Sequence, residues 1–91
     1  MAYVYITFKI MPNDVDADLK HIEVDAAAKI KTFGGNVTKI EVKPVAFGLN
    51  SVNITFSMPE SKGSTDSLEQ NITKTKGVQS VQVTDISRAL G

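Results

Sequence analysis

The chain contains no cysteine, and its charges leave no excess of either sign. Without cysteine there can be no disulfide bond, thiolate metal site, iron–sulfur cluster or thiol catalysis. Ten Lys and Arg balance ten Asp and Glu, so the formal net charge is zero. Such a chain has little electrostatic attraction for DNA or for an acidic membrane surface. We therefore expect no DNA partner and no membrane partner.

Long apolar runs are absent as well. No segment is apolar enough to span a bilayer, and the start of the chain lacks the basic flank and apolar stretch of a signal peptide. These absences predict a cytoplasmic protein. The 91 residues, 42% of them apolar, suit one compact unit, so we expect a single domain over residues 1–91.

The motifs of nucleotide and metal chemistry are missing too. There is no GxxxxGK[ST] and no GxGxxG, so direct nucleotide binding is not expected. His21, the only histidine, has no HxxxH or HExxH partner and is predicted to be solvated. Asp14, Asp16 and Asp18 are close together, but they suit the first turn of a helix, where negative charge is stabilised. We expect no catalytic site, no metal, no cofactor and no enzyme.

The chain does contain segments in which apolar residues recur at the regular spacing of strands or of helices. Apolar and polar residues alternate in four segments, the pattern of a strand that buries one face. These segments cover residues 3–10, 38–43, 51–58 and 80–84. Two other segments carry apolar residues every three or four positions, which is typical of helices. The first runs from Val15 to Phe33, and the second begins at Ser64 or Thr65.

Start and stop signals mark both predicted helices. Asp14 or Asp16 can accept the free amides of the first helix, and Gly34 can end it in the left-handed conformation. Gly77 is expected to cap the second helix. The resulting order is β-α-β-β-α-β, in which two right-handed crossovers place both helices on one face of a four-stranded antiparallel sheet. The predicted fold is therefore an α+β, ferredoxin-like sandwich.

The other face of this sheet stays open and is polar apart from Tyr3 and Tyr5. Ferredoxin-like RNA-recognition domains stack bases on aromatic residues of this face. An RNA-binding module that uses Tyr3 and Tyr5 is therefore an alternative function. The third predicted strand offers Ser51, Asn53 and Thr55 instead of further aromatic residues, which argues against it.

A small phosphatase of the acylphosphatase kind is a further alternative. It would need a phosphate-binding loop with an arginine after the first strand, and residues 11–14 contain no arginine.

The connection between the second and third predicted strands reads Lys43-Pro44-Val45-Ala46-Phe47-Gly48-Leu49. Pro44 stiffens its entry, Gly48 permits a tight turn, and Phe47 is a large apolar residue on a connection expected at the surface. Exposed aromatic residues on rigid loops are typical anchors for a partner protein. Two interpretations stay open here: Phe47 anchors a partner, or it folds back over the end of the core.

Three stretches resemble the archaeal elongation factor 1-beta family and the catalytic domain of its eukaryotic counterparts. They are residues 43–49, the Gly-Ser-Thr-Asp of residues 63–66, and residues 77–88 with their Thr-Asp-Ile. The resemblance implies a ferredoxin-like fold and a guanine-nucleotide exchange factor. Its implied partner is elongation factor 1-alpha, the GTPase that brings aminoacyl-tRNA to the ribosome.

The resemblance also implies which residues contact this GTPase. The family's loop aromatic, which reaches the partner's second domain near the site for the aminoacyl end of tRNA, falls on Phe47. Pro44 and Gly48 would shape the loop. Eukaryotic members insert a penultimate lysine toward the magnesium site, and that position falls at about Gly91 here. Arg88 is the only cation nearby, so it is the candidate for this role.

Overall fold

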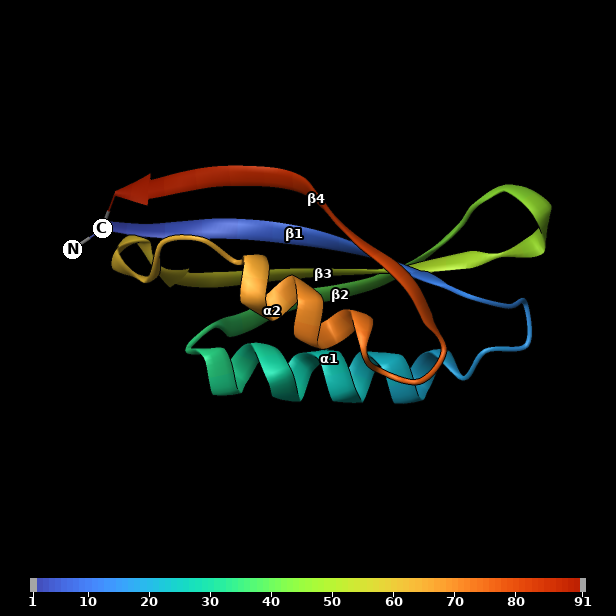
Figure 1. Cartoon of the computed structure of the whole chain (residues 1–91). Coiled ribbons are helices and arrows are strands. Elements are labelled where there is room, and N and C mark those ends of the chain that lie inside the picture. The colour runs from blue at the N-terminus through green and yellow to red at the C-terminus, as the bar shows by residue number, and fades with distance from the viewer. Residues whose placement is uncertain (1, 91) are drawn as a thin grey trace.

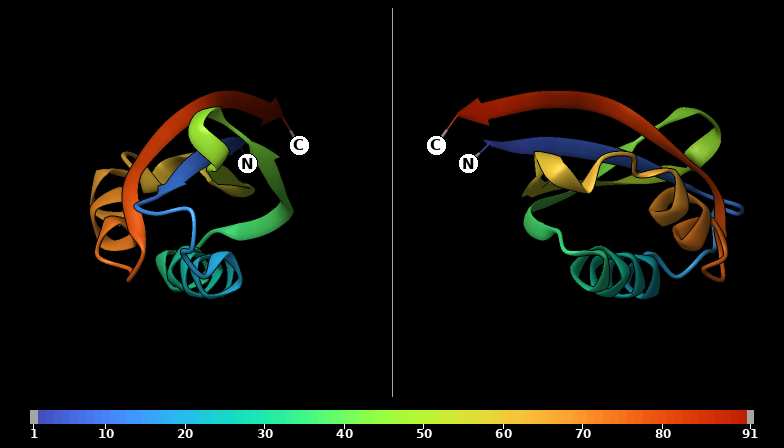
Figure 2. Two further views of the ribbon diagram at one scale, coloured as in Figure 1. Left: turned by 90° about the vertical axis from the view of Figure 1, so that its right-hand side faces the viewer. Right: turned by 60° about the vertical axis from the view of Figure 1, so that its left-hand side comes forward.

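The computed structural model describes residues 2–90, with side chains up to residue 88. Its elements are β1 (Ala2–Pro12), α1 (Leu19–Phe33), β2 (Asn36–Pro44), β3 (Asn50–Pro59), α2 (Asp66–Thr73) and β4 (Val78–Leu90). The strands form one antiparallel sheet in the order β2-β3-β1-β4, and both helices lie on the same face of it (Figures 1 and 2). This arrangement confirms the predicted ferredoxin-like α+β fold.

The hydrophobic core fills the space between the sheet and the helices. Phe8 of β1 and Phe56 of β3 meet edge to face at its centre, with ring centroids 5.0 Å apart. The three fully buried residues of α1 are spaced by four, as the helical period predicts: Ile22, Ala26 and Ile30. Within the described residues, neither helix is long and apolar enough to cross a membrane.

The first helix begins later than predicted. Asp14 accepts a hydrogen bond from the amide of Asp16 at 3.1 Å, which holds the chain in a turn before the helix. Asp18 is the N-cap, because its Oδ1 accepts from the amide of His21 at 3.1 Å. The predicted start at Val15 and the caps at Asp14 or Asp16 are therefore wrong. A short acidic side chain can bond its own neighbouring amides, and here this competes with the helix.

The second helix ends earlier than predicted. Its last residue is Thr73. The amide of Lys74 caps the helix by donating to the carbonyls of Asn71 and Ile72. Gly77 does not cap the helix. It has a φ of 93° and turns the chain into β4, where its carbonyl accepts from the amide of Asn13 at 2.8 Å.

The last strand is longer than the predicted residues 80–84. β4 pairs with β1 over almost its whole length, and Asp85 lies opposite Thr7. The register shifts just after Thr7, so Thr84 is an extra residue in the ladder. Such a bulge reverses the alternation of faces, which is why the pattern in the sequence stops there.

Candidate functional site

The hairpin between β2 and β3 ends in a tight turn. The amide of Val45 donates to the carbonyl of Leu49 at 2.8 Å, and the amide of Leu49 donates to the carbonyl of Ala46 at 3.3 Å. Phe47 and Gly48 follow each other in the left-handed region, with φ of 62° and 76°. Phe47 is the only non-glycine residue with positive φ in the described chain, a conformation that costs on the order of 1–2 kcal/mol.

Phe47 is 95% exposed. The interpretation in which it folds back over the core is therefore wrong. The ring is held in water by a turn whose two hydrogen bonds fix the backbone, an arrangement typical of an anchor for another protein.

Pro44 and Gly48 lie on either side of the residues that present Phe47. Pro44 lies opposite Asn50 at the end of the β2–β3 ladder, directly before the hydrogen bond from Val45 to Leu49 that closes the turn. A Cβ atom on Gly48 would lie 3.8 Å from the Cγ1 of Val15, so the turn after β1 supports the hairpin from the side. This turn and the hairpin extend from the same end of the molecule (Figure 1).

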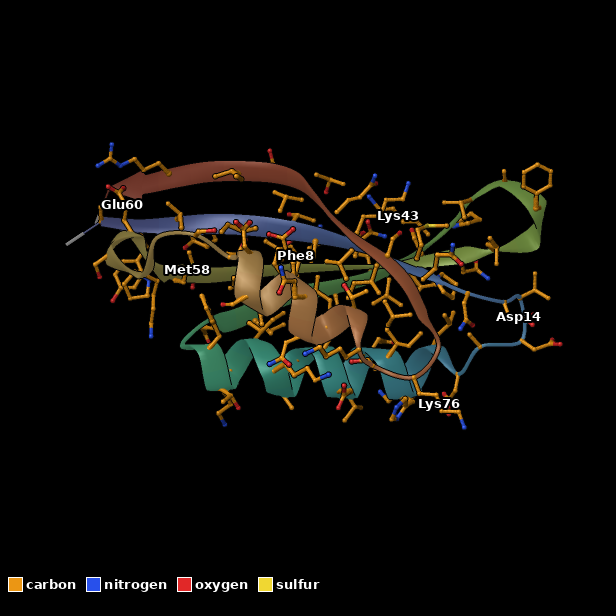
Figure 3. The ribbon with its side chains drawn as sticks, in the orientation of Figure 1. Phe8, Asp14, Lys43, Met58, Glu60 and Lys76 are labelled. Atoms are coloured by element: carbon orange, nitrogen blue, oxygen red, sulfur yellow. The ribbon has the colours of Figure 1, made fainter. Side chains whose placement is uncertain are left out.

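Arg88 lies at the other end. It pairs with Val4 in the sheet, and its guanidinium binds Glu60 through Nε to Oε2 at 2.6 Å and through a terminal nitrogen to Oε1 at 3.0 Å. Figure 3 shows Glu60 near the termini and Asp14 at the far end. The structure therefore does not bring Arg88 and Phe47 together in a molecule 42 Å long. Gly91, where the eukaryotic lysine would fall, lies outside the described residues.

Other candidate groups do not converge on a chemical site. His21 is exposed, as predicted. In the part of the chain that the structure describes, no three His, Cys, Asp or Glu side chains are placed to hold a metal ion. An open hollow of about 560 Å³ lies between the turn after β1 and the turn before β4, beside Asp14, His21 and Lys76. The sequence carried no signal for this hollow, because the two turns meet only in the folded chain.

The open face of the sheet carries the two tyrosines and polar neighbours. Tyr3 and Tyr5 are 41% and 40% exposed. Tyr5 lies between Ser57 on β3 and Ser87 on β4, so no aromatic residue lies opposite it in either neighbouring strand. This surface lacks the set of stacking aromatics that an RNA-recognition domain uses.

The fold and the hairpin tip define a class of protein: a small ferredoxin-like chain that presents one exposed aromatic residue on a strained turn. Comparison with known families identifies it further, because the EF-1 guanine nucleotide exchange domain matches residues 5–89. Elongation factor 1-beta of Methanocella arvoryzae is 36% identical, over 98% of this chain and 99% of the relative. Elongation factor 1-beta of Methanothermobacter thermautotrophicus is 31% identical, over 99% of this chain and 100% of the relative.

The chain belongs to the elongation factor 1-beta family, a family of guanine-nucleotide exchange factors in translation elongation. Solved structures outside the family share the fold alone. The C-terminal domain of MgtC from Mycobacterium tuberculosis has a TM-score of 0.64 at 11% identity, covering 96% of this chain and 87% of that one. The ACT domain of the GTP pyrophosphokinase of Chlorobium tepidum has a TM-score of 0.58 at 18% identity, covering 87% of this chain and 95% of that one.

Proposed function

We propose that this chain promotes the exchange of GDP for GTP on elongation factor 1-alpha by binding the GTPase and destabilising its magnesium and nucleotide site. The observation that carries the proposal is the 95% exposed ring of Phe47 on a strained hairpin tip, in a chain of this family. The protein would act in the cytoplasm as a single domain over residues 1–91. It would form no covalent intermediate and bind no cofactor or nucleotide of its own.

Exchange requires differential binding. The factor must bind the nucleotide-free GTPase more tightly than the GDP-bound form, and by linkage the affinity for GDP then falls by the same ratio. A thousandfold effect corresponds to about 4 kcal/mol. Disturbing the coordination of magnesium is a natural source of this energy, because the ion neutralises the charge of the phosphates.

Phe47 would supply affinity without this selectivity. Transfer of a phenyl ring from water into an apolar pocket contributes roughly 1.5–3 kcal/mol. The turn fixed by Pro44 and Gly48 holds the ring in place before the encounter, which lowers the entropy lost on binding.

Arg88 would act at the other end, toward the magnesium site. Its present partner is Glu60, and the two side chains are 61% and 45% exposed. Ion pairs at such exposure contribute at most about 1 kcal/mol. Arg88 could therefore leave Glu60 for a carboxylate of the GTPase at little cost.

The release of a fluorescent GDP from an archaeal elongation factor 1-alpha tests the proposal. We expect release to accelerate with the concentration of this protein and to saturate, because a complex forms. Amounts well below that of the GTPase should suffice, because the factor is regenerated. An unchanged release rate at saturating protein would contradict the proposal.

A further inference from the structure

The free edge of β4 lacks the usual protection of an exposed strand. In the described sheet β4 pairs with β1 alone, so about half of its backbone N–H and C=O groups point away from the other strands. β4 contains no lysine and no proline, the two residues that most often block such an edge. A bulge at Thr84 interrupts the strand once, and from Asp85 to Leu90 the register with β1 is regular. Residues 82–88 are exposed, so this half of β4 can pair with a further strand.

A groove follows this half of β4 on the helix side of the sheet. It has a volume of about 460 Å³ and lies between β4 and the beginning of α2 (Figure 1). Ile86 is 64% exposed in it, although Ile6, its partner on β1, is only 4% exposed. We call it the β4 groove; its apolar lining consists of Val4, Ile6, Met58, Val83 and Ile86. Extended peptides bind in grooves of this kind, because pairing with the edge strand gives affinity and the side-chain pocket gives specificity.

Acidic side chains line the side of the β4 groove that α2 and the turn before it form. They are Glu60, Asp66 and Glu69, and the described residues that line the groove include no lysine, arginine or histidine. Arg88 binds Glu60 beside the groove, and the hydroxyl of Thr65 donates to Oε2 of Glu69 at 2.7 Å. Three carboxylates and one guanidinium leave two negative charges in excess. Complementary charge across an interface selects the partner, so the groove favours a positively charged segment.

A second copy of this chain does not fit as the occupant. Its β4 carries one carboxylate, Asp85, and one guanidinium, Arg88, so it would bring no net positive charge in any register. Its β2 is the other free edge, but a contact between β4 of one copy and β2 of the next is head-to-tail and would build a ring or a filament. The lysines and Pro44 of β2 also oppose edge pairing. The groove therefore suits a segment of a different protein.

We propose that the β4 groove binds an extended, positively charged segment of another protein, which adds a strand to the sheet beside β4. Alternate residues of a strand point to the same face. An aliphatic residue of the segment would therefore lie next to Ile86, and a lysine or arginine two positions away would point to the same side as the carboxylates of Glu60 and Asp66. The proposal goes beyond the exchange activity, since it needs neither Phe47 nor the GTPase.

A short peptide that contains Lys-Thr-Val-Thr-Lys, acetylated and amidated at its ends, tests the groove. We expect it to shift the backbone amide resonances of residues 83–88 in NMR spectra and to saturate, because one site is filled. Ile86→Lys should weaken binding at least about tenfold, since it places a charge in the apolar groove. Val15→Lys is the matched control and should stay within about twofold of the wild type. It adds the same charge at an apolar residue that is 59% exposed, next to Asp14 at the far end of the molecule (Figure 3).

Two N-methylated forms of the peptide separate strand pairing from attraction by charge. One is methylated on the amides of its threonines and the other on those of its lysines and valine, so both keep the charge of the parent peptide. Only one of these sets of N–H groups can point toward β4, because successive amides of a strand point to opposite sides. We expect one form to bind at least about tenfold more weakly and the other to stay within about twofold of the parent.

The outcomes decide between pairing, charge and self-association. Saturable binding that Ile86→Lys and one methylated form weaken, with unchanged circular dichroism and an unaffected Val15→Lys control, supports the β4 groove. Equal binding of the two methylated forms, equal losses in the two lysine variants, or no shifts up to millimolar peptide would overturn it. A dimer or filament of the free protein that Ile86→Lys abolishes would assign the edge to a second copy instead. GDP release does not enter these measurements, so their failure leaves the proposed exchange activity untouched.

Discussion

Phe47 combines two features that folding alone does not favour. Its ring is 95% exposed, and its backbone has a φ of 62° in the region that glycine prefers. Neither feature stabilises the chain by itself. Backbone strain of this kind persists where the surrounding structure imposes it, and it concentrates at functional sites.

Replacing Phe47 should therefore separate stability from binding. We expect Phe47→Gly to stabilise the fold by up to about 1 kcal/mol, because glycine adopts positive φ without the steric cost. Phe47→Ala should change stability by less than about 0.5 kcal/mol, since the ring buries nothing in the free chain. Both variants should raise the concentration of factor needed for half-maximal GDP release. Urea unfolding and the release assay measure the two effects, and a large loss of stability in Phe47→Ala would contradict this account.

Asp25 illustrates the opposite case, a polar residue that serves the fold. It forms an ion pair with Lys29 at 3.0 Å and accepts a hydrogen bond from the hydroxyl of Thr75, which is 5% exposed. Lys29 also donates to the carbonyl of Asn71 at 2.8 Å. The cluster thus ties the middle of α1 to the end of α2. The hydrogen bond from Thr75, and then Lys29, lower the pKa of Asp25 below its usual value.

The sign of this shift fixes a pH dependence. The pKa of Asp25 is lower in the folded chain than in the unfolded one. The contribution of this carboxylate to the free energy of unfolding is therefore complete above the unfolded pKa, and it is lost as the pH falls through the folded pKa. Asp25→Asn should therefore be less stable than the wild type near pH 7, and the difference should shrink toward about pH 2. Urea unfolding across this range measures it. Thr75→Val should show the same trend, and a constant difference at all pH values would contradict it.

At the scale of elements, the sequence predicts which segments form helices and strands far better than where they end. The spacing of Ile22, Ala26 and Ile30 predicts which side of α1 the core buries, and this prediction does not depend on where the helix begins or ends. The start of α1 depends on which carboxylate reaches a free amide, and three aspartates were available. The extra residue Thr84 in β4 breaks the alternation, and only pairing with β1 shows that the strand continues.

The candidate site, too, could be predicted only in part from the sequence. The residue type and position of Phe47 in the chain marked it as a candidate, together with Pro44 and Gly48. The exposure of its ring did not follow from the sequence, because hydrophobic periodicity predicts the buried faces of helices and strands but not how a turn packs. Ile40 and Val42 have the alternation of a buried face, and only the sheet order shows that β2 is an edge strand.

A substitution at the start of α1 tests the cap seen in the structure. Asp18→Ala should cost about 1 kcal/mol, because it removes the acceptor for the amide of His21. Asp16→Ala is the control and should change stability by less than about 0.5 kcal/mol, since the hydrogen bond at this residue uses its backbone amide. Thermal unfolding distinguishes the two, and equal losses would contradict the assignment of the cap.

At the scale of the molecule, the two candidate contact points are held apart by the sheet. β1 pairs with β3 on one side and with β4 on the other, and these ladders run along the 42 Å length of the chain. The sheet fixes the separation between Phe47 and Arg88. A GTPase that contacts both must present an apolar pocket and its magnesium site at the same separation, so the two contacts can have different roles.

The ion pair of Arg88 with Glu60 allows these roles to be told apart. If Phe47 supplies affinity and Arg88 disturbs the magnesium site, Arg88→Ala should lower the maximal rate of GDP release while the half-saturating concentration stays near that of the wild type. Glu60→Gln should act in the opposite direction and raise the maximal rate, because it weakens the competitor for the guanidinium. Both side chains are exposed, so neither variant should unfold the chain. Equal maximal rates for the wild type and both variants would leave Arg88 with a structural ion pair only, and would place the action on magnesium elsewhere.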